Sequence, residues 1–188
     1  GERVPGTVGF ALPNMELRVT QDGRECSAGE IGIVEVRGDH LFTGYWGQPK
    51  KTSASFQKDG FFITGDIGWV DSGGRLSLQG RSNDMIISGG ENIYPKEVEL
   101  HLSGFSGIKE CAIVGLPHPD LGEAVTAFLI TDEDFSEIET REHIKSLVTD
   151  FRQPKKYIVV DTLPRNAMGK IQRAKLREEY STLFDDVG

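Results

Sequence analysis

The most constraining feature of this sequence is a change at residues 80–84 in the pattern of apolar residues and turn signals. Before it, short apolar runs of strand character alternate with turn signals that contain glycine. The runs lie at residues 31–36, 61–64, 67–70 and 76–79, and the turn signals at residues 21–23, 58–60 and 71–74. After it, strand-like runs alternate with segments of helical periodicity. Because domain boundaries favour exposed polar links that contain glycine, we predict two parts, residues 1–80 and 81–188.

The two parts together predict an α+β fold class. Residues 1–80 favour an antiparallel, β-barrel-like subdomain, and residues 81–188 favour a small α+β domain. In the second part, strands are expected at residues 85–87, 111–116, 124–130 and 157–160, with a tight loop at residues 88–90.

Helix signals in the second part are local. Pro95 suits the first position of a helix that we expect to end near Ser103. Ser136 and Glu139 form a capping box. The apolar residues that follow at helical spacing, and predict an amphipathic helix, are Ile144, Leu147, Val148 and Phe151. A terminal helix is expected directly after Lys170, with the apolar stripe Leu176, Tyr180, Leu183 and Phe184.

Composition excludes several classes of function. No apolar stretch approaches the roughly 18 residues of a membrane span, so none is expected. The net charge of -8 argues against non-specific nucleic-acid binding. Cys26 and Cys111 lack metal-site spacing, which favours a reducing, cytoplasmic setting and no metal site in this chain. The start at Gly1 suggests a segment of a longer protein.

One basic run stands out in this acidic chain. Residues 152–177 contain eight basic residues and a single acid, Asp161. A solvated face is the usual explanation of such a run. The alternative is a site for a phosphorylated small molecule.

The pair Gly169-Lys170 is the first candidate within this run. It is not a Walker A loop, because Pro164 and Ile171 occupy the positions that require glycine and Ser or Thr. A lysine on a glycine-containing loop ahead of a helix nevertheless suits an anion. The alternative is an exposed loop lysine with no ligand.

Two further residues are candidates with plain alternatives. Asp66 follows an apolar strand, and its carboxylate could accept hydrogen bonds from the vicinal hydroxyls of a ribose. The sequence Thr64-Gly65-Asp66 is equally compatible with a simple turn. Phe151 could form an aromatic platform beside Arg152, although its spacing favours the core.

Three motifs, in this order, resemble the adenylate-forming superfamily of acyl-CoA synthetases, adenylation domains and luciferases. They lie at residues 62–66, 80–99 and 163–170, and the similarity extends over residues 5–180. Within the superfamily, the stretches at residues 1–9, 93–97 and 114–119 resemble bacterial malonyl-CoA synthetases. The alternatives are a medium- or long-chain fatty-acyl or aryl-CoA ligase, a peptide-synthetase adenylation fragment, or a non-catalytic module that binds CoA or a nucleotide.

The resemblance implies a two-step reaction. A carboxylic acid and ATP give an acyl-adenylate and pyrophosphate, and CoA then displaces AMP. Residues 1–80 would end the large AMP-binding domain, and residues 81–188 would form its mobile lid. The rest of the large domain, which would carry the ligands of the expected Mg²⁺, would lie outside this chain, so this chain alone is expected to be inactive.

The resemblance also implies roles for single residues. Asp66 and Arg81 would bind the nucleotide, Lys170 would act in adenylation, and the hinge would lie at Asn83. The residues implied for CoA are Ser88, Gly89, Gly90, Glu91, Phe151, Arg152 and Lys155. The chain departs from the family pattern at two positions: Asn83 stands where Asp or Lys is usual, and Gln153 where some relatives have a basic residue.

Overall fold

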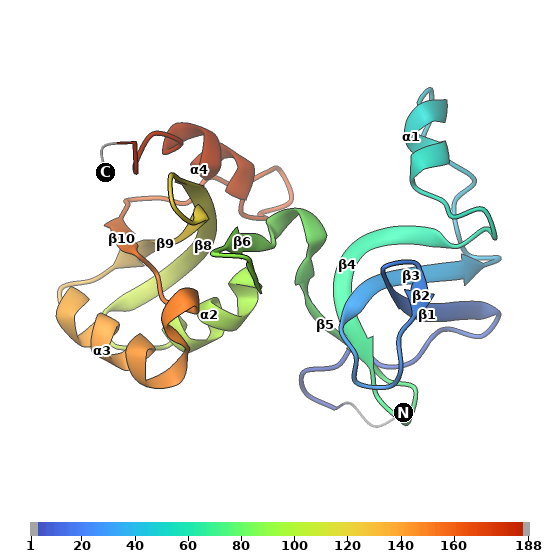
Figure 1. Cartoon of the computed structure of the whole chain (residues 1–188), viewed down its shortest axis with the longest axis horizontal. Helices are drawn as coiled ribbons and strands as arrows, with labels where there is room; N and C mark the ends of the chain where they lie inside the picture. The colour runs from blue at the N-terminus through green and yellow to red at the C-terminus, as the bar shows by residue number, and fades with distance from the viewer. Residues whose placement is uncertain (1–3, 186–188) are drawn as a thin grey trace. The chain divides into compact units, whose positions relative to one another are not determined.

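The computed structural model describes residues 4–185 and divides into two compact units, residues 1–83 and 84–188 (Figure 1). Each unit has its own sheet, and short helices accompany both, so the predicted α+β class is confirmed. Residues 1–3 of the stretch 1–9 lie outside the described residues. Within residues 4–185, no helix has the length and apolar character needed to cross a membrane.

The first unit is built around an antiparallel sheet with the strand order β2-β1-β3-β4-β5. Its strands are β1 (Met15–Gln21), β2 (Arg24–Glu25), β3 (Gly32–Gly38), β4 (Phe62–Val70) and β5 (Leu76–Arg81). Asp22 and Gly23 join β1 to β2 with positive φ angles of 52° and 79°, as a tight hairpin turn requires. The described strands form an open path with a strongly curved β4, so the unit is barrel-like without closing (Figure 1).

Three features of the first unit differ from the prediction. Residues 61–64 and 67–70 belong to one strand, β4, because Gly65 takes a φ of 75° and lets the strand continue. Strand β1 was not predicted, although apolar and polar residues alternate along it. Helix α1 (Pro49–Ala54) has no buried residue and therefore no apolar periodicity that could reveal it.

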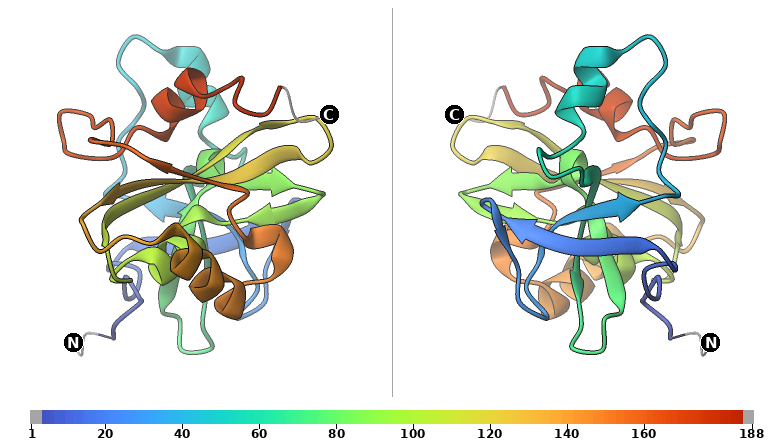
Figure 2. Two further views of the ribbon diagram at one scale, coloured as in Figure 1. Left: turned by 90° about the vertical axis from the view of Figure 1, so that its left-hand side faces the viewer. Right: turned by 90° about the vertical axis from the view of Figure 1, so that its right-hand side faces the viewer.

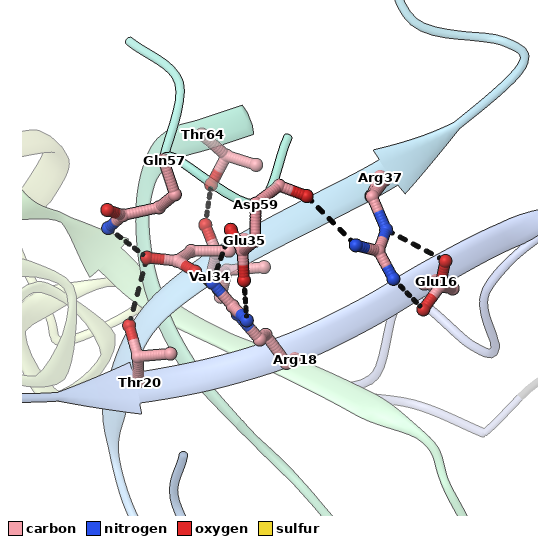
Figure 3. Close-up of polar contacts among 9 residues, drawn as sticks. All are labelled: Glu16, Arg18, Thr20, Val34, Glu35, Arg37, Gln57, Asp59 and Thr64. Carbon is pink, nitrogen blue, oxygen red and sulfur yellow. Dashed lines mark hydrogen bonds and ion pairs between the residues drawn. The ribbon is translucent and has the colours of Figure 1, made fainter. Parts of the chain in front are cut away.

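A buried carboxylate joins β1, β3 and the loop that precedes β4 (Figure 3). The Glu35 side chain is 1% exposed. It accepts hydrogen bonds from Arg18 Nε at 2.7 Å, Thr20 Oγ1 at 3.1 Å and Gln57 Nε2 at 2.8 Å. Arg18 also bonds both carboxylate oxygens of Asp59. This network satisfies a charge that would otherwise be costly to bury.

In its described residues, up to 185, the second unit contains a mixed sheet and three α-helices. The sheet has the order β10-β9-β6-β7, with β8 paired to β9 and with β10 parallel to β9. The strands are β6 (Ile86–Ser88), β7 (Glu91–Ile93), β8 (Ile108–His118), β9 (Gly122–Thr131) and β10 (Lys156–Val159). The α-helices are α2 (Pro95–Leu102), α3 (Glu137–Leu147) and α4 (Arg173–Glu179), and the 3₁₀ helices are η1 (Ser82–Asp84) and η2 (Asp150–Arg152).

Helices cover both faces of this sheet (Figure 2). Alternate residues of β9 point to opposite faces, as the strand period requires. Val125, Ala127 and Leu129 pack in one core cluster with residues of α2 and α3. Ala124 and Phe128 pack in a second cluster with Leu176 of α4. The unit is therefore three-layered, with β8 and β9 at its centre.

The local helix signals are confirmed, whereas the extent of two helices was predicted wrongly. Helix α2 starts at Pro95, and Ser136 Oγ caps α3 by accepting from Glu139 N at 3.4 Å. Helix α3 ends at Leu147, which is 47% exposed, because the β-branched pair Val148-Thr149 takes extended angles. Phe151 therefore lies on η2.

The terminal helix is shorter at both ends than predicted. It begins at Arg173, because Ile171 forms a β-bridge with Arg165 and so keeps the chain after Lys170 extended. It ends at Glu179, so Leu183 and Phe184 lie in the turns that follow. Phe184 is nevertheless buried in the same core cluster as Leu176.

We predict that Arg18→Met destabilises the first unit by about 2 kcal/mol, because Glu35 would remain buried with one charged partner fewer. Arg37→Met is the matched control: Arg37 lies over the same Phe61 ring, but its partner Glu16 is exposed. Urea unfolding followed by fluorescence reports this unit, since both tryptophans lie in it. Equal losses in the two variants would contradict the importance of the buried pair.

Candidate functional site

Asp66 and Arg81 are cross-strand neighbours on β4 and β5. Arg81 Nε lies 3.0 Å from Asp66 Oδ1, and Arg81 Nη1 donates to the Thr64 carbonyl at 2.9 Å. The backbone is fixed from the other side, because Asp66 N donates to Thr64 Oγ1 at 3.0 Å. Both side chains retain solvent exposure, 24% for Asp66 and 54% for Arg81. The structure thus brings together the two predicted nucleotide-binding residues as an accessible ion pair.

Lys170 sits on a small loop that one side chain organises. Asn166 Oδ1 accepts hydrogen bonds from Met168 N and Lys170 N, each at 3.0 Å. Gly169 supports the turn with a φ of 78°, and Arg165 Nη1 donates to its carbonyl at 2.6 Å. No role was predicted for Asn166, although asparagine commonly bonds backbone amides in this way.

The Lys170 side chain itself is exposed. Within residues 4–185, its ammonium has no hydrogen bond or ion pair. The loop is attached to β8 through the ion pair between Arg165 and Glu110. A free cation on an ordered loop suits an anion site.

The glycine pair forms the tip of the β6–β7 hairpin. Ser88 and Glu91 are paired across it, and Gly89 and Gly90 between them have φ angles of 59° and 85°. Gly89 N donates to the Leu121 carbonyl at 2.9 Å, and Ser88 is 2% exposed. The predicted tight loop is confirmed. It presents backbone without side chains at its two central positions.

Residues 151–155 form a second candidate surface, in which the cations already have partners. Arg152 forms an ion pair with Glu97 of α2, and Lys155 Nζ donates to the Asp150 carbonyl at 3.1 Å. Phe151 packs, partly buried, against the core cluster of α2 and α3, as its spacing favoured. Beside this ion pair, burial and then the Glu97 charge raise the pKa of the Tyr94 hydroxyl above its ordinary value, while Arg152 opposes them.

Half of the cations in the basic run are paired with acids, so the run is not a continuous patch of free positive charge. Its four arginines pair with acids that lie outside the run. The pairs are Arg152–Glu97, Arg165–Glu110, Arg173–Glu99 and Arg177–Glu123. These partners are more than 50 residues away in sequence, so a local charge count misses them. Arg173 also pairs with Asp84.

The Lys170 loop and the glycine hairpin lie at opposite ends of the β8–β9 ladder (Figure 2, left). Arg165 anchors the loop to Glu110, which is paired with Ile130 of β9. Ser88 of the hairpin is paired with Gly122, eight residues back along β9. At about 3.3 Å per residue, these two attachment points are roughly 25 Å apart. Lys155 N bonds the Val125 carbonyl, so residues 151–155 attach nearer to the hairpin end.

No cluster of three metal-ligating side chains occurs in the part of the chain that the structure describes. The two cysteines are free.

Comparison with known proteins finds similarity to one family model and to several CoA ligases. The family model of the AMP-binding enzyme C-terminal domain matches residues 97–170. A 2-succinylbenzoate–CoA ligase of Listeria monocytogenes is 40% identical over 176 residues, which are 94% of this chain and 36% of that ligase. The long-chain-fatty-acid–CoA ligase FadD13 of Mycobacterium tuberculosis is 39% identical over 180 residues, which are 95% of this chain and 36% of that ligase.

Solved structures agree with these relatives. ATP-bound MatB from Rhodopseudomonas palustris is 45% identical and has a TM-score of 0.93, over 98% of this chain and 37% of MatB. The apo structure of MatB covers the same 98% of this chain with a TM-score of 0.68. The chain therefore spans about a third of the length of the relatives it matches.

We predict that Asn166→Ala loosens the Lys170 loop and speeds amide hydrogen exchange at Met168 and Lys170 by about tenfold, since each amide loses its acceptor. Asn166→Asp is the control, because it keeps an oxygen at the same place. Exchange measured by NMR on this chain should stay slow in the Asp variant. Unchanged exchange in the Ala variant would show that the backbone holds the loop unaided.

Proposed function

We propose that the chain is the C-terminal portion of an adenylate-forming acyl-CoA ligase, and that the longer protein joins a carboxylic acid to CoA at the cost of ATP. The reaction proceeds through an acyl-adenylate and releases AMP and pyrophosphate. Residues 1–80 complete the large nucleotide-binding domain in this proposal, and residues 81–188 form its lid. The remainder of the large domain is the partner that completes the site.

The observation that carries the proposal is the separation of the two loops. The Lys170 loop and the glycine hairpin belong to one compact unit, yet their attachment points are roughly 25 Å apart along β9. They cannot both reach one reacting carbonyl at the same time. A two-step reaction, in which each step uses one end of the lid, accounts for this arrangement.

In the first step, Asp66 and Arg81 hold the nucleotide. The ion pair between them uses one Asp66 oxygen, and a carboxylate has about four acceptor positions, so two ribose hydroxyls can still bind. Arg81 uses Nε and Nη1 within the unit and retains further N–H donors of its five for the nucleotide. The pair can thus orient the ribose, because acceptors of Asp66 and donors of Arg81 remain available after the ion pair has formed.

Lys170 supplies positive charge where the carboxylate attacks the α-phosphate. Negative charge is redistributed there as pyrophosphate leaves, and a fixed cation stabilises that transition state. Its unpaired ammonium and its Asn166-ordered backbone suit this role. The expected Mg²⁺ would be held by residues outside this chain.

In the second step, the lid turns about Asn83 and brings the glycine hairpin to the acyl-adenylate. Gly89 and Gly90 let the narrow pantetheine arm pass close to the backbone, between Ser88 and Glu91. Phe151, Arg152 and Lys155, nearer this end of the sheet, then face the nucleotide part of CoA. The ATP-bound and apo structures of MatB match this chain at TM-scores of 0.93 and 0.68, a difference that a movement of this kind would account for.

We propose malonate as the acid, on the resemblance of residues 1–9, 93–97 and 114–119 to malonyl-CoA synthetases. A longer fatty acid or an aryl acid is the alternative, because relatives named for 2-succinylbenzoate and for long-chain fatty acids are 40% and 39% identical to this chain. A cytoplasmic location is part of the proposal and rests on the two unpaired cysteines.

We expect Lys170→Ala in the longer protein to slow ATP–pyrophosphate exchange by about 10² to 10³-fold. Thioester formation from supplied acyl-adenylate should change by less than about threefold, since that step uses the other end of the lid. Lys175→Ala, an exposed basic residue on α4, is the control and should leave both rates unchanged. Equal losses in both half-reactions would contradict the assigned role, and CoA binding without any turnover would favour a non-catalytic module.

A panel of acids tests the substrate. With the longer protein, kcat/KM for malonate should exceed that for acetate by at least about 10²-fold, because a pocket built for a second carboxylate is left unpaired by acetate. Methylmalonate, octanoate and 2-succinylbenzoate complete the panel. A preference for either of the last two would replace malonate with the fatty-acyl or aryl alternative.

A further inference from the structure

The link between the two units is anchored on both sides of Asn83. On one side, Ser82 Oγ donates to the Gly65 carbonyl of the first unit at 3.2 Å. On the other, Asp84 Oδ2 lies 3.3 Å from Arg173 Nη1, within the second unit. Asn83 stands between these anchors and is exposed. Each neighbour of Asn83 is thus bound to its own unit.

Arg173 makes more contacts than the Asp84 pair alone. Its Nη2 lies 2.6 Å from Glu99 Oε1 on α2, and its Nε donates to the Ile113 carbonyl of β8 at 3.2 Å. The same Glu99 oxygen accepts from Ile113 N at 2.9 Å. One guanidinium therefore ties the end of η1 to α2, β8 and the start of α4. Its side chain is 20% exposed, so these bonds are partly shielded from water.

The position of Arg173 is not explained by helix stability. It is the first residue of α4, where the helix dipole disfavours a cation. The carboxylates of Asp84 and Glu99 offset this cost. A guanidinium offers a planar fork that can reach two carboxylates and a carbonyl at once, which a lysine ammonium on its flexible stem does less well.

We propose that Asp84 and Arg173 form a hinge clamp that confines the rotation of the lid to Asn83 and carries Lys170 with it. The inference rests on the proposed function. Lys170 lies three residues before Arg173, so an arginine fixed to the pivot also fixes the entry of the Lys170 loop into α4. Both members of the clamp are positioning residues.

Loss of the clamp would lengthen the pivot. Each residue freed beyond Asn83 adds two soft backbone dihedrals to the link. The lid would then approach the nucleotide in a wider range of orientations. Because a misplacement of about 1 Å can cost up to about 10²-fold in rate, adenylation should slow although no group that contacts the substrate has changed.

Arg177 provides a matched control on the same helix. It lies four residues after Arg173 and therefore on the same face of α4. It also reaches β8, since its Nε donates to the Gly115 carbonyl at 3.0 Å, and its Nη2 lies 3.8 Å from Glu123. In the described residues it makes no hydrogen bond or ion pair with residues 82–84. Its polar contacts thus fix α4 without involving the pivot.

The test uses the longer protein with Asp84→Asn, Arg173→Met, the double variant and Arg177→Met. We expect Asp84→Asn to slow ATP–pyrophosphate exchange by about tenfold. The KM for ATP should stay unchanged, because the change affects the orientation of the lid and not the binding of ATP. The double variant should be no slower than Arg173→Met alone, because both changes remove the same interaction. Arg177→Met should stay within about twofold of the unchanged protein.

A second measurement does not depend on activity. Hydrogen exchange should be faster for residues 84–86 in Asp84→Asn and Arg173→Met, and unchanged in Arg177→Met. The Ile87 amide is left out of the comparison, because it donates to Glu123, the partner of Arg177. Losses that multiply in the double variant, or unchanged exchange at residues 84–86, would overturn the clamp. If no acid of the panel supports ATP–pyrophosphate exchange, the proposed function is overturned. Hydrogen exchange would then still decide whether Asp84 and Arg173 restrain the link.

Discussion

The antiparallel pairing of β8 with β9 is the interaction on which the rest of the second unit depends. The two strands contain 11 and 10 residues and are paired from Ile108 opposite Thr131 to His118 opposite Gly122. Both faces of the ladder are buried, and every α-helix of the unit packs on one of them. Both proposed functional loops are also fixed to it, one at each end. The length of the ladder therefore sets the distance between them.

Most of the fold could be predicted from local signals in the sequence. Pro95, the Ser136 capping box and the glycine turns each act through their nearest neighbours, and all were found where predicted. Helix α1 failed for the opposite reason, since a short helix without a buried face leaves no periodic pattern. Helix α3 was predicted to be too long, because the helical spacing of apolar residues continues to Phe151. The β-branched residues Val148 and Thr149 end the helix before that point.

Candidate site residues could be chosen from the sequence, but the partners of their charges could not. Asp66 and Arg81 are 15 positions apart, and strand pairing brings them together. The partners of the arginines in the basic run come from elements more than 50 residues earlier, so only the folded chain shows that these cations are already paired. The same holds for Glu35, whose burial nothing in its surroundings in the sequence would suggest. In both cases the charged side chain is held in an ion pair, whereas a count of charges in the sequence treats it as unpaired.

In the proposed rotation, the ladder would also set how accurately the lid must stop. The pivot side of the lid is attached through Arg173 to Ile113, opposite Ala127, which lies five residues or about 16 Å from the hairpin end at Gly122. A turn of one degree about that point moves the hairpin end by about 0.3 Å, so an error of about 1 Å at a reacting centre corresponds to about three to four degrees. Because the two loops lie far from the link, a small angular error at Asn83 becomes a large displacement at the reacting centre. This explains why the residues on either side of Asn83 would be bound firmly while Asn83 itself is left free.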